Sequence, residues 1–261
     1  MVAVLIFLLG LVVGSFLNAF LYRMEKGESV AKGRSYCPAC SHGLAWNDLI
    51  PLLSFVALQG KCRYCHAPIS WEHPLFEIST GLLFLAIAIL TGEIYSFLSL
   101  IHLLYLLVVA SCLIGIFIYD FKHFLIPDRL LVPAVLASVA WYFIAGLSGF
   151  IPLSSLAVNI GAAILAAGAF FSLHFVSQGK WMGFADGKLV FLLGLVLGFP
   201  LILVSLLITF VTGSLTGIVL ILLQKKTFKS EVPFAPFLIL GMFAALFWGN
   251  HAVAWYLHLL Y

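Results

Sequence analysis

Residues 101–120 read IHLLYLLVVASCLIGIFIYD, an apolar run that ends on a carboxylate. Residues 101–119 hold no Asp, Glu, Lys or Arg, and as one helix they are long enough to cross the hydrocarbon core of a bilayer. Asp120 therefore lies at the end of a predicted membrane span. A carboxylate in that position is expensive and marks a candidate functional site.

Similar apolar segments recur along the chain and decide its fold class. Of the 261 residues, 64% are hydrophobic and only 9% are charged, which excludes an ordinary soluble domain. We expect an all-α polytopic membrane protein with about eight transmembrane helices and one small cytosolic domain of the zinc-ribbon kind. The first segment lacks the positive start of a cleaved signal peptide, so we expect it to be retained. The expected spans are 1–22, 74–92, 95–118, 129–147, 152–176, 187–204, 206–223 and 234–260.

The basic residues predict the orientation of these spans. With the N-terminus outside, every Lys and Arg falls in an inside loop or at the cytosolic end of a span, whereas the outside loops carry only Glu93. The net charge of +3 therefore reflects membrane topology, and we expect the lipid bilayer and no nucleic acid as a partner. The predicted inside loops are 23–73, 119–128, 177–186 and 224–233.

The first inside loop differs in composition from the rest of the chain. Residues 23–73 contain four of the five cysteines, in the order Cys37-Pro-Ala-Cys40 and Cys62-Arg-Tyr-Cys65. Two C-x2-C pairs of thiolates suit tetrahedral Zn²⁺, and a bound metal would replace the hydrophobic core that so short a loop lacks. We therefore divide the chain into a first span at 1–22, a zinc-binding domain at 23–73 and a multi-span domain at 74–261.

Other interpretations of the cysteines carry less weight. Two disulfides conflict with the reducing cytosol predicted for this loop, and a redox dithiol would not require two matched pairs. His42 and His66 are alternative ligands, although four cysteines already complete a site. Cys112 lies within a predicted span, where it is expected to be a packed small residue.

Asp120 and Asp186 form the candidate catalytic pair. Asp120 ends a predicted helix, where the negative end of the helix dipole favours the protonated form. The alternative for Asp120 is a solvated boundary carboxylate held by Lys122 or Arg129.

Asp186 precedes a predicted helix, and taken alone it would be an N-cap. Gly183 and Gly187 on either side allow close backbone approaches and favour a functional role, and free amides at the helix start favour the ionised form. Two such carboxylates can share one proton and activate water. Asp128 follows Pro127 at a predicted helix start, so we expect an N-cap there.

The chain resembles the type IV prepilin leader peptidases, membrane aspartic proteases that also N-methylate the new pilin N-terminus. The resemblance extends over nearly the whole chain and rests on several motifs. Besides the four cysteines, these are Gly14-Ser-Phe-Leu-Asn18 with Tyr22-Arg23, Asp48-Leu-Ile-Pro51, Pro74-Leu-Phe-Glu77, the segment from Asp120 to Asp128, and Asp186-Gly-Lys-Leu.

By this resemblance, Asp120 and Asp186 are the catalytic pair, and Cys37, Cys40, Cys62 and Cys65 bind structural zinc. It also implies a location in the bacterial cytoplasmic (inner) membrane, a cytosol-facing active site, and a type IV pilus or type II secretion system. The implied substrates are pilin-like precursors with an apolar N-terminal helix, and S-adenosylmethionine is the implied methyl donor for the 23–73 region. The family motif Gly-x-Gly-Asp here reads Gly183-Phe-Ala-Asp186, so Ala185 replaces a glycine.

Two other classes of protein remain open from the residues alone. Membrane-boundary carboxylates also mark ion paths, so an ion- or metal-coupled transporter is one alternative. Neither an inverted repeat nor a pair of broken spans is evident, which weighs against it. The other alternative is a non-enzymatic pilus or secretion assembly factor, for which loss of Asp120 would leave function intact.

Overall fold

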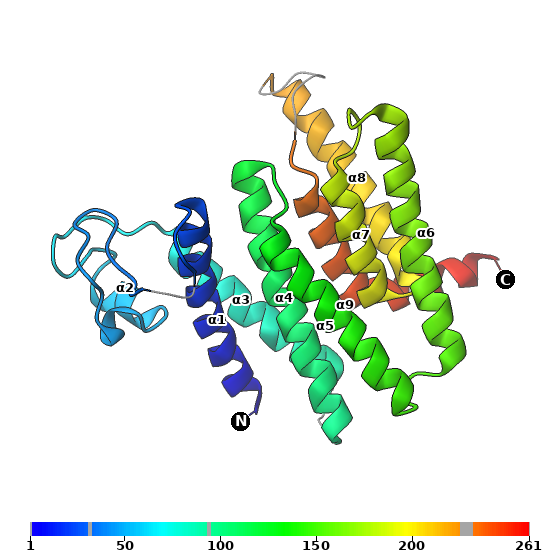
Figure 1. The fold of residues 1–261 in the computed structure, drawn as a ribbon, viewed down its shortest axis with the longest axis horizontal. Helices are drawn as coiled ribbons and strands as arrows, with labels where there is room; N and C mark the ends of the chain where they lie inside the picture. The colour runs from blue at the N-terminus through cyan, green and yellow to red at the C-terminus, as the bar shows by residue number, and fades with distance from the viewer. Residues whose placement is uncertain (1, 31–32, 93–94, 225–231, 261) are drawn as a thin grey trace. The chain divides into compact units, whose positions relative to one another are not determined.

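The computed structural model describes residues 2–30, 33–92, 95–224 and 232–260. These residues form an all-α protein (Figure 1), and within them no β-strand longer than an isolated bridge is found. The long helices are α1 (Val2–Glu25), α3 (Glu72–Thr91), α4 (Phe97–His123), α5 (Asp128–Leu147), α6 (Leu153–Ser177), α7 (Phe184–Leu197), α8 (Leu201–Leu222) and α9 (Ala235–Leu260). The short η1 (Trp46–Asp48) and α2 (Leu53–Ala57) lie in the loop between α1 and α3.

The chain divides into two compact units, residues 1–111 and 112–261, with the boundary inside α4. The first unit therefore holds the first span, the cysteine loop and the second span. The second unit holds both candidate aspartates, so the cysteines at 37–65 and the aspartates belong to different units.

In the first unit, α1 and α3 pack closely through small residues. A Cβ atom at Gly10 would lie 2.7 Å from the Cα atom of Gly81, and one at Gly14 would lie 2.9 Å from the Cα atom of Glu77. Only glycine allows two helix backbones to approach this closely, which is a common way for membrane helices to associate. The contact fixes Glu77 of α3 beside Gly14 of α1.

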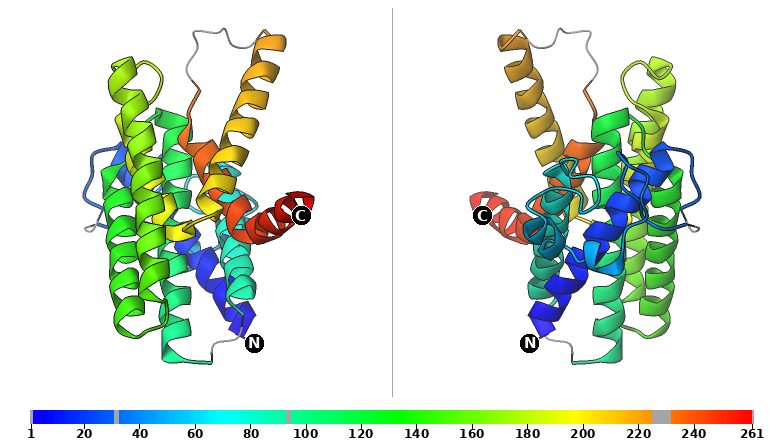
Figure 2. Two further views of the ribbon diagram at one scale, coloured as in Figure 1. Left: turned by 90° about the vertical axis from the view of Figure 1, so that its right-hand side faces the viewer. Right: turned by 90° about the vertical axis from the view of Figure 1, so that its left-hand side faces the viewer.

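In the second unit, α7 packs against α5, α6, α8 and α9. Leu189, Val190, Leu192 and Leu193 of α7 are completely buried, which explains why the sequence of this helix is apolar on every face. The helices α8 and α9 pack against one another as a pair (Figure 2). The candidate aspartate on α7 therefore stands on the most enclosed helix of the unit.

Seven of the described helices are long and apolar enough to cross a membrane, and α7 is the exception among the predicted spans. The predicted span 187–204 is wrong in its C-terminal half, because α7 ends at Leu197 and α8 already begins at Leu201. Gly198 adopts a φ of +66° and Pro200 follows, so the helix stops there. The 14 residues of α7 rise about 21 Å, which is less than the hydrocarbon thickness of about 30 Å.

The other predicted spans match α1, α3, α4, α5, α6, α8 and α9 within a few residues. The span predicted at 234–260 is one continuous helix. Several charged residues used for the topology prediction lie outside the described residues: Lys32, Glu93, Lys225, Lys226 and Lys229.

Candidate functional site

Asp120 lies in the last turn of α4 and is buried, with only 5% of its surface exposed. The backbone amide of Ala235, the first residue of α9, is a hydrogen-bond donor to its carboxyl group. The Oδ2 atom is buried and has no hydrogen-bond partner among the described residues. A solvated boundary aspartate is therefore excluded. Such an unsatisfied oxygen needs an explanation, and a shared proton or a bound substrate would supply one.

Asp186 is the third residue of α7 and lies inside the helix, so the predicted N-cap position is wrong. Its Oδ2 atom accepts a hydrogen bond of 2.9 Å from the backbone amide of Gly183, which is the N-cap residue. This is the carboxylate half of a capping box, which a side chain at the third helical position can make. The helix begins earlier than predicted because Phe184 and Ala185 already adopt helical geometry.

The fold of the second unit brings the two carboxylates together. The charge of Asp120 acts directly on the carboxyl group of Asp186. Asp120 lies in the last turn of α4, and Asp186 lies in the first turn of α7. Helix α9 packs against α7, and the backbone amide of its first residue donates to Asp120. Two interacting carboxylates, one of them buried, can divide general-acid and general-base roles in the hydrolysis of a peptide bond.

Asp128 does not cap α5 as predicted. It is the first residue of α5, its neighbour Pro127 occupies the N-cap position, and no side chain caps the helix there. Instead, its Oδ1 atom accepts a hydrogen bond of 2.8 Å from Lys188 Nζ on α7. Because α5 packs on α7, the Lys188 ammonium lies within reach of Asp128. The carboxylate forms an ion pair in place of the expected capping hydrogen bond with a backbone amide.

The four cysteines of the first unit form one cluster. Their sulfur atoms all lie within 4.8 Å of one another, and Cys37 and Cys65 are 3.8 Å apart. None of them is in a disulfide, so this part of the chain offers four free thiols that are close enough to bind one metal ion. Neither His42 nor His66 belongs to the cluster.

Each cysteine pair lies in the same kind of turn. The carbonyl of Cys37 accepts a hydrogen bond from the Ser41 amide, and the carbonyl of Cys62 accepts one from the His66 amide. Ser41 and His66 both adopt a positive φ, 56° and 57°. Matching isolated bridges close the turns, Tyr36 with Gly43 and Lys61 with Pro68. The loop therefore contains the same turn twice, and each copy presents a C-x2-C pair in the way that a metal-binding knuckle does.

The thiols of the cluster differ in acidity. A hydrogen bond from the Cys40 amide lowers the pKa of Cys37 to about 7. The Ala67 amide lowers the pKa of Cys65, but burial and hydrogen bonds with the other thiols outweigh it and raise the pKa to about 12. With no metal bound, the high pKa of Cys65 keeps that thiol protonated, and four thiolates would repel one another in so small a space. A divalent metal would remove that repulsion and lower both pKa values.

Cys112 of α4 is buried, as predicted for a packed small residue. It belongs to the second unit, whereas the cysteine cluster belongs to the first.

Sequence reasoning misses two contributions to the aspartate site. It identifies Lys188 as a topology marker and not as the partner of Asp128, and it does not single out Ala235. The sequence gives one indication of a role for Lys188, which is its position in the Asp186-Gly-Lys motif, and it gives none for Ala235.

Two family models match the chain. The bacterial peptidase A24 N-terminal domain matches residues 8–91, and the type IV leader peptidase family matches residues 107–218. No solved structure matches the chain.

Curated relatives are similar over most of their length. A prepilin leader peptidase/N-methyltransferase of Aeromonas hydrophila is 32% identical, with 97% of this chain and 93% of the relative aligned. Proteins of the same name from Stutzerimonas stutzeri and Myxococcus xanthus are 30% and 37% identical, covering 95% and 84% of this chain and 91% and 63% of the relatives. With both family models on one polytopic helical chain, the protein belongs to the type IV leader peptidase family.

Proposed function

We propose that this protein cleaves the leader from pilin-like precursors with Asp120 and Asp186 as its catalytic pair. Membership of the family supports the peptidase activity, and the approach of two carboxylates from distant segments supports the residues. The unsatisfied Oδ2 of Asp120 is the observation that carries the assignment, because few buried carboxylate oxygens lack a partner without a functional reason.

In the proposed reaction, the ionised aspartate takes a proton from water as the water oxygen attacks the scissile carbonyl carbon. The protonated aspartate donates its proton to the carbonyl oxygen. The aspartate that took the proton from water then protonates the leaving nitrogen as the C–N bond breaks. The other aspartate takes a proton from a hydroxyl of the tetrahedral intermediate as the new carboxylic acid forms, so the pair again holds one proton. The position of Asp120 at a helix C-terminus favours it as the protonated member, and the amide of Gly183 favours Asp186 as the ionised member.

The substrate follows from the location of this pair. Asp120 lies in the last turn of a membrane-length helix, so the scissile bond should lie at the end of an apolar segment and not in its middle. A pilin-like precursor, with a polar leader before an apolar N-terminal helix, has its cleavage site at that boundary. By the family resemblance, the bond follows a glycine.

The second proposed activity is methylation of the new N-terminus, as in the names of the relatives. S-adenosylmethionine would supply the methyl group. We assign this activity to the region 23–73, with Zn²⁺ held by the four cysteines as a structural ion. The tetrathiolate donor set and the two matched knuckles support zinc over harder cations.

We further place the protein in the bacterial inner membrane, with its N-terminus outside and the aspartate pair facing the cytosol. The asymmetric distribution of Lys and Arg supports this orientation. The reducing cytosol would also keep the four thiols available for the metal.

One experiment tests both activities. The purified protein is incubated with a pilin-like precursor, with and without S-adenosylmethionine, and the product masses are measured. We expect loss of the leader in both reactions and one added methyl group only with the donor. An intact precursor under conditions that support a related peptidase would contradict the peptidase assignment, and a cleaved but unmethylated product would contradict the methyltransferase assignment alone.

A further inference from the structure

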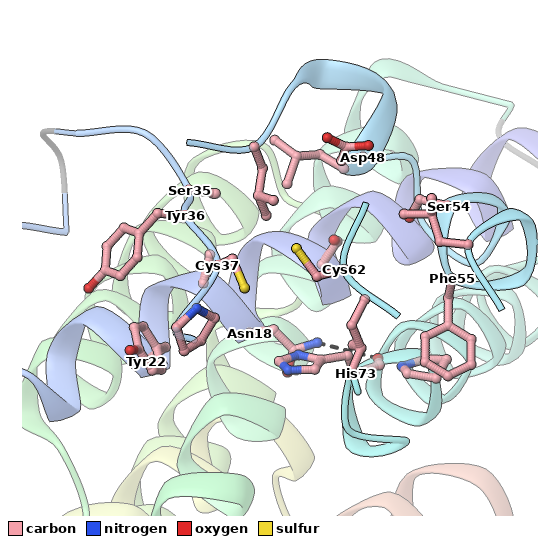
Figure 3. Close-up of a pocket in the computed structure, with 18 of the residues that line it drawn as sticks. Asn18, Tyr22, Ser35, Tyr36, Cys37, Asp48, Ser54, Phe55, Cys62 and His73 are labelled. Atoms are coloured by element: carbon pink, nitrogen blue, oxygen red, sulfur yellow. Dashed lines mark hydrogen bonds between the residues drawn. The ribbon is translucent and has the colours of Figure 1, made fainter. Parts of the chain in front are cut away.

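The first unit contains a pocket of about 310 Å³ between α1, the start of α3 and the cysteine loop (Figure 3). Its volume is in the range of small-molecule sites. In Figure 3, Cys37 and Cys62 lie between Tyr22 and Tyr36 on one side and Phe55 on the other. All of the residues that line the pocket belong to the first unit, whereas the aspartate pair belongs to the second.

One wall of the pocket is a stripe of α1. Ser15, Asn18, Ala19, Tyr22 and Arg23 line it, at the spacing that places side chains on one face of a helix. The Nδ2 atom of Asn18 donates a hydrogen bond of 3.3 Å to the backbone carbonyl of His73 in the first turn of α3, which connects this wall to the next. The motif at 14–18 and the Tyr-Arg pair after it therefore converge on one cavity.

Glu77 of α3 is the unusual residue of the pocket. It is buried, with 8% of its surface exposed, and its carboxylate Oε2 atom accepts a hydrogen bond of 2.9 Å from the Leu52 amide. No ion pair to Glu77 is found among the described residues. Burial of a carboxylate without a cation is costly. A positively charged ligand in the pocket would offset this cost.

Asp48 is the other acidic residue that lines the pocket, and its carboxylate already has hydrogen-bond partners. Its Oδ1 atom accepts a hydrogen bond of 2.7 Å from Arg63 Nε, and its Oδ2 atom accepts one of 3.1 Å from the Ala45 amide. Burial alone would raise the pKa of Asp48, but these hydrogen bonds outweigh it and hold the pKa below its usual value. Asp48 therefore joins η1 to the second cysteine knuckle, and Glu77 is left to face a ligand.

Aromatic rings complete the site. The rings of Tyr22 and Tyr36 meet edge to face with centroids 6.1 Å apart, and the Tyr36 hydroxyl donates a hydrogen bond of 2.7 Å to Glu28. Phe55 on the opposite side is held edge to face against Trp71 at 4.9 Å. Fixed rings suit a planar base by stacking and a cation by its attraction to the π face.

We propose that this pocket is the methyl-donor site, in which S-adenosylmethionine binds with its cationic end toward Glu77 and its base among the aromatic rings. The proposal rests on the methyltransferase part of the proposed function. A nucleoside sulfonium combines the three properties that the pocket selects: a positive charge for a buried anion, a planar base for aromatic walls, and a size that fits the cavity. The two arginines that line the pocket have other partners, because Arg63 pairs with Asp48 and Arg23 donates a hydrogen bond to the Gly33 carbonyl. A phosphate-bearing nucleotide would therefore meet repulsion from the Glu77 carboxylate.

The site also gives the metal a role in the second activity. Cys37 and Cys62, which belong to the thiol cluster, line the pocket directly. In the reaction, the neutral N-terminal amine would attack the methyl carbon. The C–S bond would break with its electron pair on sulfur, and the nitrogen would release a proton to solvent. The metal would hold the pocket wall without taking part in these bond changes.

Equilibrium binding of radiolabelled S-adenosylmethionine to the purified full chain tests the proposal. We expect saturable binding to the parent protein and at least a tenfold loss of affinity in Glu77→Gln. The loss should be smaller for S-adenosylhomocysteine, whose sulfur is neutral. Glu72→Gln is the matched control, because Glu72 is exposed on the same helix and does not line the pocket. It should bind like the parent protein.

A second variant, Ala19→Leu, fills the pocket from α1 without removing a polar group and should also weaken binding. Circular dichroism and metal content identify any variant that fails to fold. If Glu77→Gln fails to fold, the affinity of Ala19→Leu tests the proposal in its place. If the parent protein binds the donor and methylates the product, and the folded variants bind the donor as tightly as the parent, then the donor binds elsewhere in the chain. The proposed function would be unaffected by that result. A parent protein that neither binds the donor nor methylates would refute both, with leader cleavage as the separate readout of the peptidase.

Discussion

Lys188 Nζ lies 2.8 Å from Asp128 Oδ1, and this ion pair joins the N-terminal end of α7 to the first turn of α5. Lys188 is two residues beyond Asp186, and its ammonium also lies 5.7 Å from the centre of the Phe184 ring. The pair therefore holds the turn that carries the proposed catalytic carboxylate. Its two side chains are partly exposed, so we expect its contribution to lie in positioning more than in stability.

We expect Asp128→Asn and Lys188→Gln each to reduce leader cleavage several-fold and to change the free energy of unfolding by less than about 1 kcal/mol. The double variant should be no worse than the poorer single variant, because each change breaks the same ion pair. Cleavage rates of the four proteins at saturating precursor measure this coupling. Additive losses would show that the two residues act independently.

Asp120→Asn and Asp186→Asn should each reduce cleavage at least about 100-fold, because an amide cannot serve as acid or base. Asp128→Asn is the comparison variant, since it alters a nearby carboxylate that pairs with Lys188, and its loss should be only several-fold. Cleavage of a pilin-like precursor in detergent, with helical content checked by circular dichroism, gives the comparison. Parent-like cleavage by either catalytic variant would remove that residue from the mechanism.

The rate of cleavage should depend on pH with a bell shape. At low pH both carboxyl groups are protonated and no base remains. At high pH both are ionised and no acid remains, so activity falls on each side of the optimum. The rates should be measured under single-turnover conditions across the acidic and neutral range. A plateau that extended without decline to high pH would show that no protonated carboxyl group is required.

We expect the purified protein to contain one zinc ion per chain, and Cys37→Ser or Cys62→Ser to lose it. These two cysteines are buried and line the pocket, so metal loss should loosen the loop and impair methyl transfer more than cleavage. Elemental analysis and the two activity assays test this expectation. Serine at Cys112, which lies outside the cluster, should leave the zinc content unchanged. A metal-free active protein would contradict the assignment.

Packing of α6 on α7 should depend on Gly194. A Cβ atom there would lie 2.5 Å from the Cα atom of Ala163, so Gly194→Ala must separate the two helices. We expect a loss of about 1–3 kcal/mol of stability, as in overpacked cores. Gly161→Ala on α6 is the control, because a Cβ atom at Gly161 would meet no atom within 4 Å. Thermal unfolding in detergent should separate the two variants, and equal melting temperatures would contradict this account of the contact.

Most of the fold was predictable from local sequence. Long apolar segments predicted eight spans, and seven of them are membrane-length helices among the described residues, since a helix in lipid must satisfy its own backbone and carry apolar side chains. The paired cysteines predicted their cluster because a C-x2-C turn presents both sulfurs on one side. The extent of α7 was missed because its neighbour α8 is equally apolar, and hydrophobicity alone does not show where one helix stops.

The sequence by itself determined the helical membrane class, the cysteine cluster and the family, because each depends on composition or on residues close together in the chain. Only the tertiary structure decided that Asp128 pairs with Lys188 across 60 residues, that the amide of Ala235 reaches Asp120, and that Glu77 is buried beside α1. These contacts join distant segments whose surfaces are uniformly apolar. No periodicity in such helices records which faces meet, so close packing through residues such as Gly14 and Gly194 sets their register.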